Sequence, residues 1–255
     1  MEFIVTANTD IGIVKDTNQD GMSVKVIDTP QGKMPFAILC DGMGGLAKGE
    51  VASTTLIAAF NGWVFDNLAV LCNKPIEDSD IRNQWERIIV SQKNNIKNYG
   101  ARQGIRLGTT AVVMLLTESR YYILNVGDSR AYEISDTLHQ ITEDQTFVAR
   151  EIQLGRMTPE EAKSDSRRNV LLQCVGASEE VYPDMFFGET KKDAVYMLCS
   201  DGFRHEITPD EIYEKFQPNA SYSADAMNEN SRSLIELNKS RSERDNISVV
   251  LVRTY

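Results

Sequence analysis

Histidine is nearly absent from this chain, which has only two, His139 and His205, among its 255 residues. A metal site built mainly from histidines is therefore excluded. The cysteines are also few and far apart, at Cys40, Cys72, Cys174 and Cys199. No two of them form a Cys-x-x-Cys pair, so neither a zinc site nor a disulfide framework is indicated. A reducing cytoplasm is the simplest compartment for such a chain.

Positive charge is scarce as well, since 37 acidic and 27 basic residues give a formal net charge of −10. Nucleic acids and anionic membrane surfaces require clustered Lys and Arg, so we expect neither as a partner. No apolar run approaches the ~20 residues that span a bilayer. The N-terminus lacks the basic and apolar regions of a signal peptide. These absences together predict a cytoplasmic protein.

The hydrophobic pattern changes between strand-like and helix-like periods along the chain. Short β-rich runs predict strands at 4–6, 22–27, 35–40, 109–116, 121–126, 131–134, 138–141, 194–199 and 247–252. The four runs between 109 and 141 are close together and predict an antiparallel meander. Helices are predicted at 51–64, 81–99 and 224–237, and at the Thr-Pro-x-Glu boxes that begin with Thr158 and Thr208. This order favours an α+β fold with a single domain over residues 1–255.

Five aspartates fall where strands are expected to end, namely Asp20, Asp41, Asp128, Asp201 and Asp245. Taken singly, an Asp-Gly pair is more often only a turn, because Asp bonds its own backbone and Gly accepts positive φ. The set of five is harder to explain by turns alone, because carboxylates at the mouth of one sheet repel each other unless cations neutralise them. Oxygen ligands suit Mg²⁺ or Mn²⁺, and two such ions can activate a water and clamp a phosphoryl group.

Seven motifs then occur in order along nearly the whole chain. They are Thr9–Asp20, Asp41–Gly45, Gly108–Thr110, Val126–Tyr132, Arg168–Val170, Ser200–Gly202 and Arg244–Asn246. Together they resemble the metal-dependent serine/threonine protein phosphatases of the PPM (type 2C) family, in their compact bacterial form. The resemblance implies a four-layer α-β-β-α sandwich of two antiparallel sheets flanked by helices. It also implies hydrolysis of phosphoserine and phosphothreonine in proteins by a metal-bound bridging hydroxide, opposing a bacterial Ser/Thr kinase.

The resemblance assigns the metal ligands residue by residue. Two ions, Mn²⁺ or Mg²⁺, are expected, with Asp20 bridging them and Asp41, the Gly42 carbonyl, Asp201 and Asp245 completing their shells. Asp128 matches a ligand of a third, weaker site that it shares with Asp201. The pair Gly44-Gly45 is expected to let the chain bend closely around a bound ion.

Some positions depart from the family pattern. Lys15 stands where the family has an arginine that holds the substrate phosphate. Lysine keeps the positive charge but cannot form the two parallel hydrogen bonds that a planar guanidinium makes with a phosphate. Met43 stands where animal members carry a histidine proposed as general acid, and the flap segment has Asp165 to Asn169 without a histidine. The proton donor is therefore unassigned, and Asp165 is a weak alternative because an exposed carboxyl with a pKa near ~4 is a poor acid at neutral pH.

A flap beside the active site is expected at about 147–169, with two short helices broken at Gly155. Phosphorylated proteins, such as a Ser/Thr kinase or its targets, are the expected partners, and a monomer is expected. Two other functions stay open. One is a phosphatase-like binding module without catalysis, which the costly carboxylate cluster argues against. The other is a phosphatase for a small metabolite, which the sequence barely separates from a protein phosphatase.

Overall fold

The computed structural model describes residues 1–44 and 48–255. Its strands are β1 (Phe3–Asp10), β2 (Asp20–Thr29), β3 (Gly32–Gly44), β4 (Leu107–Thr109), β5 (Ala111–Leu116), β6 (Arg120–Val126), β7 (Arg130–Ile134), β8 (Leu138–Gln140), β9 (Asp184–Glu189), β10 (Val195–Cys199) and β11 (Ile247–Thr254). Its longer helices are α1 (Gly49–Trp63), α3 (Asp78–Gln103), α7 (Pro209–Phe216) and α8 (Ala224–Ser240). Shorter ones are η1 (Val64–Leu68), α2 (Ala69–Leu71), α4 (Phe147–Gln153), α5 (Pro159–Ser164), α6 (Asp201–Arg204) and η2 (Pro218–Ala220).

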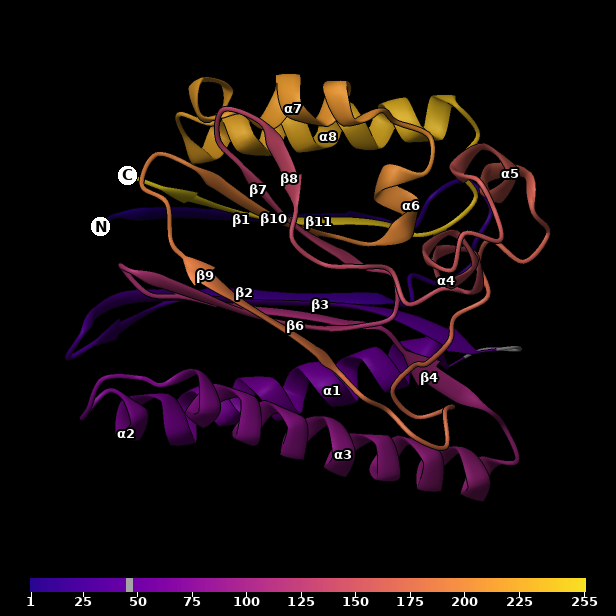
Figure 1. Ribbon diagram of the computed structural model, residues 1–255, viewed down its shortest axis with the longest axis horizontal. Coiled ribbons are helices and arrows are strands. Elements are labelled where there is room, and N and C mark those ends of the chain that lie inside the picture. The colour runs from indigo at the N-terminus through magenta and orange to yellow at the C-terminus, as the bar shows by residue number, and fades with distance from the viewer. Residues whose placement is uncertain (45–47) are drawn as a thin grey trace.

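Two antiparallel sheets pack face to face between two layers of helices (Figure 1). One sheet has the strand order β1-β11-β10-β7-β8, and the other follows β2-β3-β5-β6-β9 with β4 beside β3. Helices α7 and α8 cover the first sheet, and α1 and α3 cover the second (Figure 1). The predicted α+β sandwich of four layers is confirmed.

Burial accounts for the mainly apolar character of the central strands. The whole of β5, β10 and β11 is buried, because a helix layer covers one face and the other sheet covers the opposite face. The contact between the sheets includes Leu39, Val112, Tyr196 and Val250. Beneath the second sheet, the indole of Trp85 is fully buried and lies edge-on to Phe60 at 5.9 Å between ring centroids.

The predicted meander between residues 109 and 141 is wrong, because its four strands divide between the two sheets. The β5–β6 hairpin belongs to the second sheet, whereas β7 and β8 belong to the first. The chain crosses at Gly127, which has φ of +102°. A Cβ at Gly127 would stand 2.7 Å from the Thr110 side chain, so glycine lets the chain pass closely over Thr110, between β4 and β5. This crossing places Asp128 at the mouth between the sheets.

The helix formed by α1, η1 and α2 is long and apolar enough to span a membrane by length and composition, although the sequence contains no continuous apolar run of that length. Its inner face packs on β3 and accounts for much of this apolar character, since Leu56, Phe60 and Trp63 are all buried in the core. This helix is therefore best described as a core helix of the sandwich.

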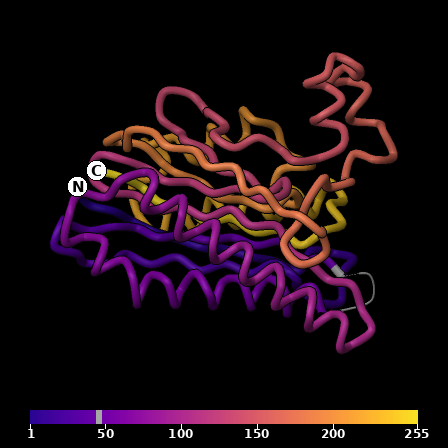
Figure 2. Tube along the Cα trace, turned by 60° about the horizontal axis from the view of Figure 1, so that its bottom comes forward, coloured from indigo at the N-terminus to yellow at the C-terminus, as the bar shows by residue number. Residues whose placement is uncertain are grey.

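The flap, residues 147–169, protrudes from the end of the sandwich remote from both termini (Figure 2). It contains α4 and α5, as predicted, and Gly155 follows α4. The capping boxes predicted at Thr158 and Thr208 are both present, each with the threonine side chain accepting from the N–H of a glutamate three residues on.

Candidate active site

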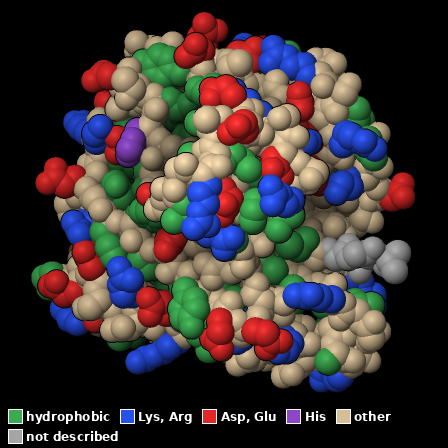
Figure 3. All heavy atoms as spheres, turned by 45° about the vertical axis from the view of Figure 1, so that its right-hand side comes forward, with side chains coloured by type: hydrophobic (Ala, Val, Ile, Leu, Met, Phe, Trp, Pro, Cys, Tyr) green, Lys and Arg blue, Asp and Glu red, His purple; other side chains and the backbone are tan. Residues whose placement is uncertain are grey.

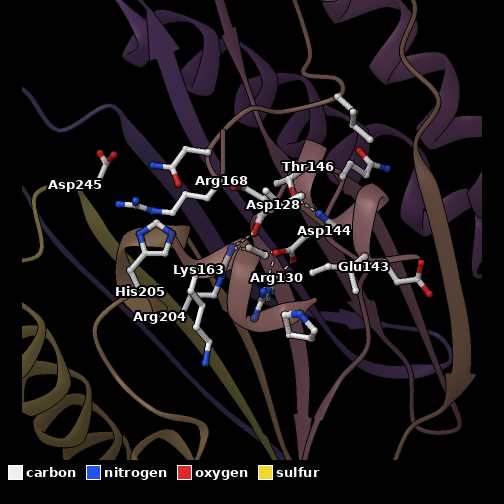
Figure 4. A pocket seen from close by; sticks show the side chains of 18 of the residues that line it. Asp128, Arg130, Glu143, Asp144, Thr146, Lys163, Arg168, Arg204, His205 and Asp245 are labelled. Atoms are coloured by element: carbon white, nitrogen blue, oxygen red, sulfur yellow. Dashed lines mark hydrogen bonds and ion pairs between the residues drawn. The ribbon is translucent and has the colours of Figure 1, made fainter. Parts of the chain in front are cut away.

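The end of the sandwich that carries the flap holds a cleft of about 1470 Å³. Its lining includes Lys15, Asp128, His205 and Asp245, together with residues of α4 and α5 (Figure 4). Asp20, Asp41 and Asp201 do not line the cleft. Both carboxylate oxygens of Asp20 and one of Asp201 are buried, and Asp41 is half-buried. We refer to Asp20, Asp41, Asp128, Asp201 and Asp245 as the aspartate cluster.

Asp20 and Asp41 face each other across adjacent strands, since they are direct partners in the β2–β3 register. Thr110 fixes the backbone of Asp41 on its other side. The Asp41 N–H donates to the Thr110 hydroxyl at 2.9 Å, and the Thr110 N–H donates to the Asp41 carbonyl at 2.9 Å. The Gly108–Thr110 motif therefore acts by holding Asp41 in place, a role that the sequence did not show.

Gly42 follows Asp41 where three backbone segments meet. Its N–H donates to the Gln19 carbonyl at 3.1 Å. A Cβ on Gly42 would stand 2.3 Å from the Gly49 carbonyl oxygen and 2.6 Å from that of Gln19, so no larger residue fits without backbone movement. The Gly44-Gly45 bend predicted next to it includes Gly45, which lies outside the described residues.

Asp128 owes its position to Gln145, a residue to which the sequence assigned no role. The Gln145 side chain accepts from the Gly127 N–H at 2.8 Å and donates to the Asp184 carboxylate at 2.7 Å. Its own N–H donates to the Gly127 carbonyl at 3.0 Å. Gln145 therefore clamps the crossing turn and connects it to the base of the flap.

Asp201 and Asp245 come from the first sheet. Asp201 is the first residue of α6, directly after β10, and Asp245 lies two residues before β11. Asn246 ties this region to the loop that carries Lys15, since its side chain donates to the Ile11 carbonyl at 2.9 Å and accepts from the Gln19 N–H at 2.9 Å. Asn246 is a second organising residue that sequence reasoning missed, although it stands next to Asp245 in a recognised motif.

Burial and mutual repulsion raise the pKa values of three members of this cluster, Asp20, Asp41 and Asp128. Burial first, and then the charges of Asp201 and Asp245, raise the pKa of Asp20 to about 7. Burial and the neighbouring aspartates raise the pKa of Asp41 well above its usual range. Burial and Asp201 raise the pKa of Asp128 to about 7. The folded chain therefore holds several carboxyls that resist ionisation unless a positive charge is supplied.

The donor set fits divalent cations in chemistry. Within the described residues, both side-chain oxygens of Asp20 and one of Asp201 are buried without a hydrogen-bond partner. Buried polar atoms normally have a partner, and a hard cation would supply one for carboxylate oxygens. The coordination shell is not closed, however, because no three Asp, Glu, His or Cys side chains in 1–44 and 48–255 are grouped tightly enough to hold an ion.

Lys15 lies beside the cluster, as the sequence predicted, but its partner there is a carboxylate. Its Nζ is 2.9 Å from the Asp245 Oδ1, with both side chains partly exposed. Burial by itself would lower the pKa of Lys15, but the bond to Asp245 outweighs it and the pKa is raised. Lys15 is therefore charged at neutral pH and stands at the entrance to the cluster.

His205 is brought to the site by the structure, at the C-terminal end of α6. Its Nε2 is 3.7 Å from Asp201 and its Nδ1 is 3.5 Å from Glu243. Burial acts to lower the pKa of His205, but Glu243 and Asp201 outweigh it and the pKa is raised. The signal in the sequence was its position four residues after Asp201, on the same face of one helical turn.

Asp165 does not have the properties of a general acid. It forms a bidentate pair with Arg167, with bonds of 3.0 and 2.8 Å, and this pair lowers the pKa of Asp165 to about 2. Arg167 in turn stacks over the Phe147 ring at 4.1 Å. Asp165 therefore stabilises the flap internally and has no proton to give at neutral pH.

A cleft with buried carboxylates on strand ends, at one end of a two-sheet sandwich, is the arrangement that we expect of a metal-dependent hydrolase. Residues 13–238 match the family described as protein phosphatase 2C, and the chain belongs to that metal-dependent family. It is a serine/threonine protein phosphatase of the bacterial type.

Relatives and solved structures agree with this assignment. The chain is 30% identical over 248 residues to the serine/threonine phosphatase stp of Listeria monocytogenes, covering 96% of this chain and 93% of that protein. It is 32% identical over 252 residues to PstP of Mycobacterium tuberculosis, covering 96% of this chain but 44% of that protein. The crystal structure of Stp1 from Staphylococcus aureus matches with a TM-score of 0.84 at 27% identity, over 100% of this chain and 96% of that one. The catalytic domain of PstP in complex with two manganese ions matches with a TM-score of 0.75 at 30% identity, over 98% and 97% of the two chains.

Proposed function

We propose that this phosphatase uses a pair of divalent ions, held by Asp20, Asp41, the Gly42 carbonyl, Asp201 and Asp245, to remove phosphate from phosphoserine and phosphothreonine in proteins. The observation that carries the proposal is the aspartate cluster itself. Among the described residues, both side-chain oxygens of Asp20 and one of Asp201 are buried without a hydrogen-bond partner, and the pKa values of Asp20 and Asp41 are raised, a state that cations relieve. The PstP catalytic domain, which was solved with two manganese ions, supports a pair of ions here.

When bound, the ions would activate a bridging water as hydroxide and neutralise the phosphoryl charge, so that hydrolysis needs no phosphoenzyme. The chain's own residues supply the framework for this. Thr110 fixes the backbone of Asp41, Gln145 fixes the turn before Asp128, and Lys15 offers a positive charge to the substrate phosphate at the cleft entrance. Asp128, with Asp201, would hold a third and weaker ion.

The remaining parts of the proposal concern the ion and the setting. Mn²⁺ and Mg²⁺ both accept an oxygen-only ligand set, and we propose either as the working ion. We further propose that the protein acts as a monomer of one domain in the cytoplasm, where it opposes a bacterial Ser/Thr kinase. Net charge of −10 supports the absence of nucleic acid and anionic membrane among its partners.

The test begins with metal-depleted protein and an aryl phosphate. Phosphate release should appear on addition of Mn²⁺ and collapse in Asp201→Asn, whereas Asp210→Asn, an exposed aspartate on α7, serves as the matched control and keeps full activity. A wild-type protein that stays inactive at saturating Mn²⁺ and Mg²⁺ would overturn the metal mechanism. Phosphopeptides and small phosphate esters, compared by kcat/KM, then separate a protein substrate from a metabolite.

A further inference from the structure

Glu243 is a buried carboxylate without a strong cationic partner. Most glutamates of the chain are exposed, and acidic side chains are interspersed with Lys and Arg on the face turned forward in Figure 3. Among the described residues, the buried glutamates are Glu133 and Glu243. Lys191 lies 2.6 Å from Glu133 and offsets its charge. Glu243 has no such lysine or arginine in 1–44 and 48–255, so other groups must donate hydrogen bonds to it.

The donors to Glu243 are backbone N–H groups of the loop that carries Asp245. One carboxylate oxygen, Oε1, accepts from the Arg244 N–H at 2.7 Å and from the Asp245 N–H at 2.8 Å. The other oxygen, Oε2, lies 3.5 Å from His205 Nδ1. His205 and Asp245 lie on the same side of the cleft (Figure 4). Glu243 therefore holds the backbone of a proposed metal ligand.

The C-terminal end of α8 fixes Glu243 itself. Ser242 has φ of +71°, the left-handed conformation that ends a helix in a Schellman motif. Both hydrogen bonds of that motif are present. The Ser242 N–H donates to the Lys239 carbonyl at 3.1 Å, and the Glu243 N–H donates to the Asn238 carbonyl at 3.0 Å. The direction of Glu243 is thus set by the helix end and does not depend on a bound ion.

The same end of α8 supports the helix that begins with Asp201. Asn238 is fully buried, and its side chain donates to the Phe203 carbonyl at 2.8 Å, two residues after Asp201 in α6. Gly202 lies directly against the Asp245 loop, since a Cβ there would stand 3.2 Å from the Asp245 Cβ. The end of α8 lies next to α6 (Figure 1). The two ligands from the first sheet therefore share one support.

Asp245 needs such support more than the ligands of the second sheet do. Asp20 and Asp41 lie within paired strands, β2 and β3. Asp245 instead lies in a loop, two residues before β11, and its side chain is 36% exposed. Ordering a loop residue costs conformational entropy, and a loop that is fixed in advance spares a ligand that cost.

We propose that Glu243 is a positioning residue for the metal pair, which fixes the backbone of Asp245 before an ion binds. The proposal rests on the metal-dependent function above and adds to it a residue outside the aspartate cluster. Without this carboxylate, the N–H groups of Arg244 and Asp245 can bond to water, because neither residue is buried. The chain then still folds, but the loop moves more freely and the ions bind less tightly.

The experiment compares two substitutions of similar size that both remove the charge. Glu243→Gln keeps an oxygen that can accept the two N–H groups, whereas Glu243→Leu does not. Titration calorimetry of metal-depleted protein with Mn²⁺ should give a Kd about tenfold higher for the leucine variant than for the glutamine variant, as expected for hydrogen bonds that position a ligand. The glutamine variant should stay nearer to wild type.

Kinetics provide a second measurement on the same variants. The Mn²⁺ concentration that gives half the maximal rate with an aryl phosphate should rise in the same order as Kd. The KM for the aryl phosphate at saturating Mn²⁺ should stay unchanged, because Glu243 acts on the metal ligand and not on the substrate. If the leucine variant does not fold, Glu243→Ala replaces it in the comparison with Glu243→Gln.

Asn230→Ala is the matched control for a loss of stability. Asn230 also lies on α8, and its side chain donates two hydrogen bonds to backbone, at the carbonyls of Lys215 and Ala220. None of these three residues lines the cleft. The control should lower Tm and leave the Kd for Mn²⁺ unchanged, and an equal rise of Kd in the control and in Glu243→Leu would overturn the positioning role.

Two further outcomes distinguish this inference from the function on which it rests. A wild type that binds Mn²⁺, together with equal Kd values for Glu243→Gln and Glu243→Leu, would overturn the positioning role and leave the phosphatase standing. A wild type that binds neither Mn²⁺ nor Mg²⁺ would overturn the proposed function instead.

Discussion

The aspartate cluster and the flap border the same cleft, but they differ in how much of the supporting structure is buried. Asp41 and Asp201 stand at the ends of strands that are buried along most of their length. The flap helix α4 has no buried residue, and α5 has only Ala162. The flap is instead closed at its base, where the Phe147 N–H donates to the Val170 carbonyl at 2.8 Å.

The two regions therefore differ in how easily they move. Residues fixed by the core move only when the whole domain of strands around them opens, whereas segments with few buried contacts open at low free energy. We therefore expect the carboxylates to keep a constant geometry and the flap to change shape more easily. The predictions below test that division.

The largest effect is expected from Asp41→Asn. Removing this carboxylate should lower kcat for an aryl phosphate at least about a hundredfold, because a metal ion contributes several kcal/mol and each 1.36 kcal/mol is tenfold in rate. Steady-state kinetics at saturating Mn²⁺ measures this. A change at the flap, such as Leu154→Ala, an exposed residue, should leave the same rate nearly unchanged. A similar loss of kcat in both variants would contradict the view that the flap has no part in the chemical step.

The second prediction concerns the stability of the metal-depleted chain. The pKa values of Asp20 and Asp128 are raised to about 7 from an ordinary value of 3.8. Between about pH 4 and pH 7 the folded chain therefore binds more protons than the unfolded chain, so the free energy of unfolding falls as pH rises. Thermal unfolding should show a lower Tm at pH 8 than at pH 5, and Mn²⁺ should restore it at pH 8.

The control for this pH effect is Asp20→Asn, which cannot ionise. It should raise the Tm of the metal-depleted protein at pH 8, flatten the pH dependence, and respond less to Mn²⁺. Because the carboxyls interact, the gain is on the order of a few kcal/mol at most. A metal-depleted wild type with the same Tm at pH 5 and pH 8 would show that the cluster is not under electrostatic strain.

A smaller effect is expected when the flap is shortened. Thr146 and Leu171 form an isolated antiparallel bridge, so the base already brings the two ends together. Replacing residues 148–169 by a short Gly-Ser linker should change Tm by only a few degrees, because one side chain within α4 and α5 is buried. Hydrolysis of an aryl phosphate should persist while kcat/KM for phosphopeptides falls. Loss of folding on this replacement would contradict the view of the flap as a loosely held segment.

The smallest effect is expected at the contact between the two regions, where Lys15 pairs with Asp245. Lys15→Gln removes a positive charge and frees the carboxylate, so Mn²⁺ should bind up to about fivefold more tightly, the range for a partly exposed ion pair. Titration calorimetry on metal-depleted protein measures this. The same variant should raise KM for substrate, and Lys15→Arg should lower it because arginine grips phosphate with two hydrogen bonds. Unchanged Mn²⁺ affinity would show that Lys15 does not compete with the ion.

Much of the scaffold was determined by local sequence signals. The period of two in the strands, the helical stripe through Leu56 and Phe60, and the boxes at Thr158 and Thr208 each specify an element from nearby residues, and the structure contains all of them. The ordered motifs also located the aspartates, because each strand-end carboxylate has a recognisable turn beside it.

Only the tertiary structure decided how these pieces combine. A hairpin and a crossing between sheets use the same kind of short strand, so the sequence did not show that β6 and β7 belong to different sheets. The structure shows the crossing at Gly127, where the chain passes close to Thr110. The contacts of Gln145 with Gly127 and Asp184, and the approach of His205 to Glu243, link residues far apart along the chain. Local periodicity carries no information on such pairs, because they form only when both sheets pack and bring their strand ends to one cleft.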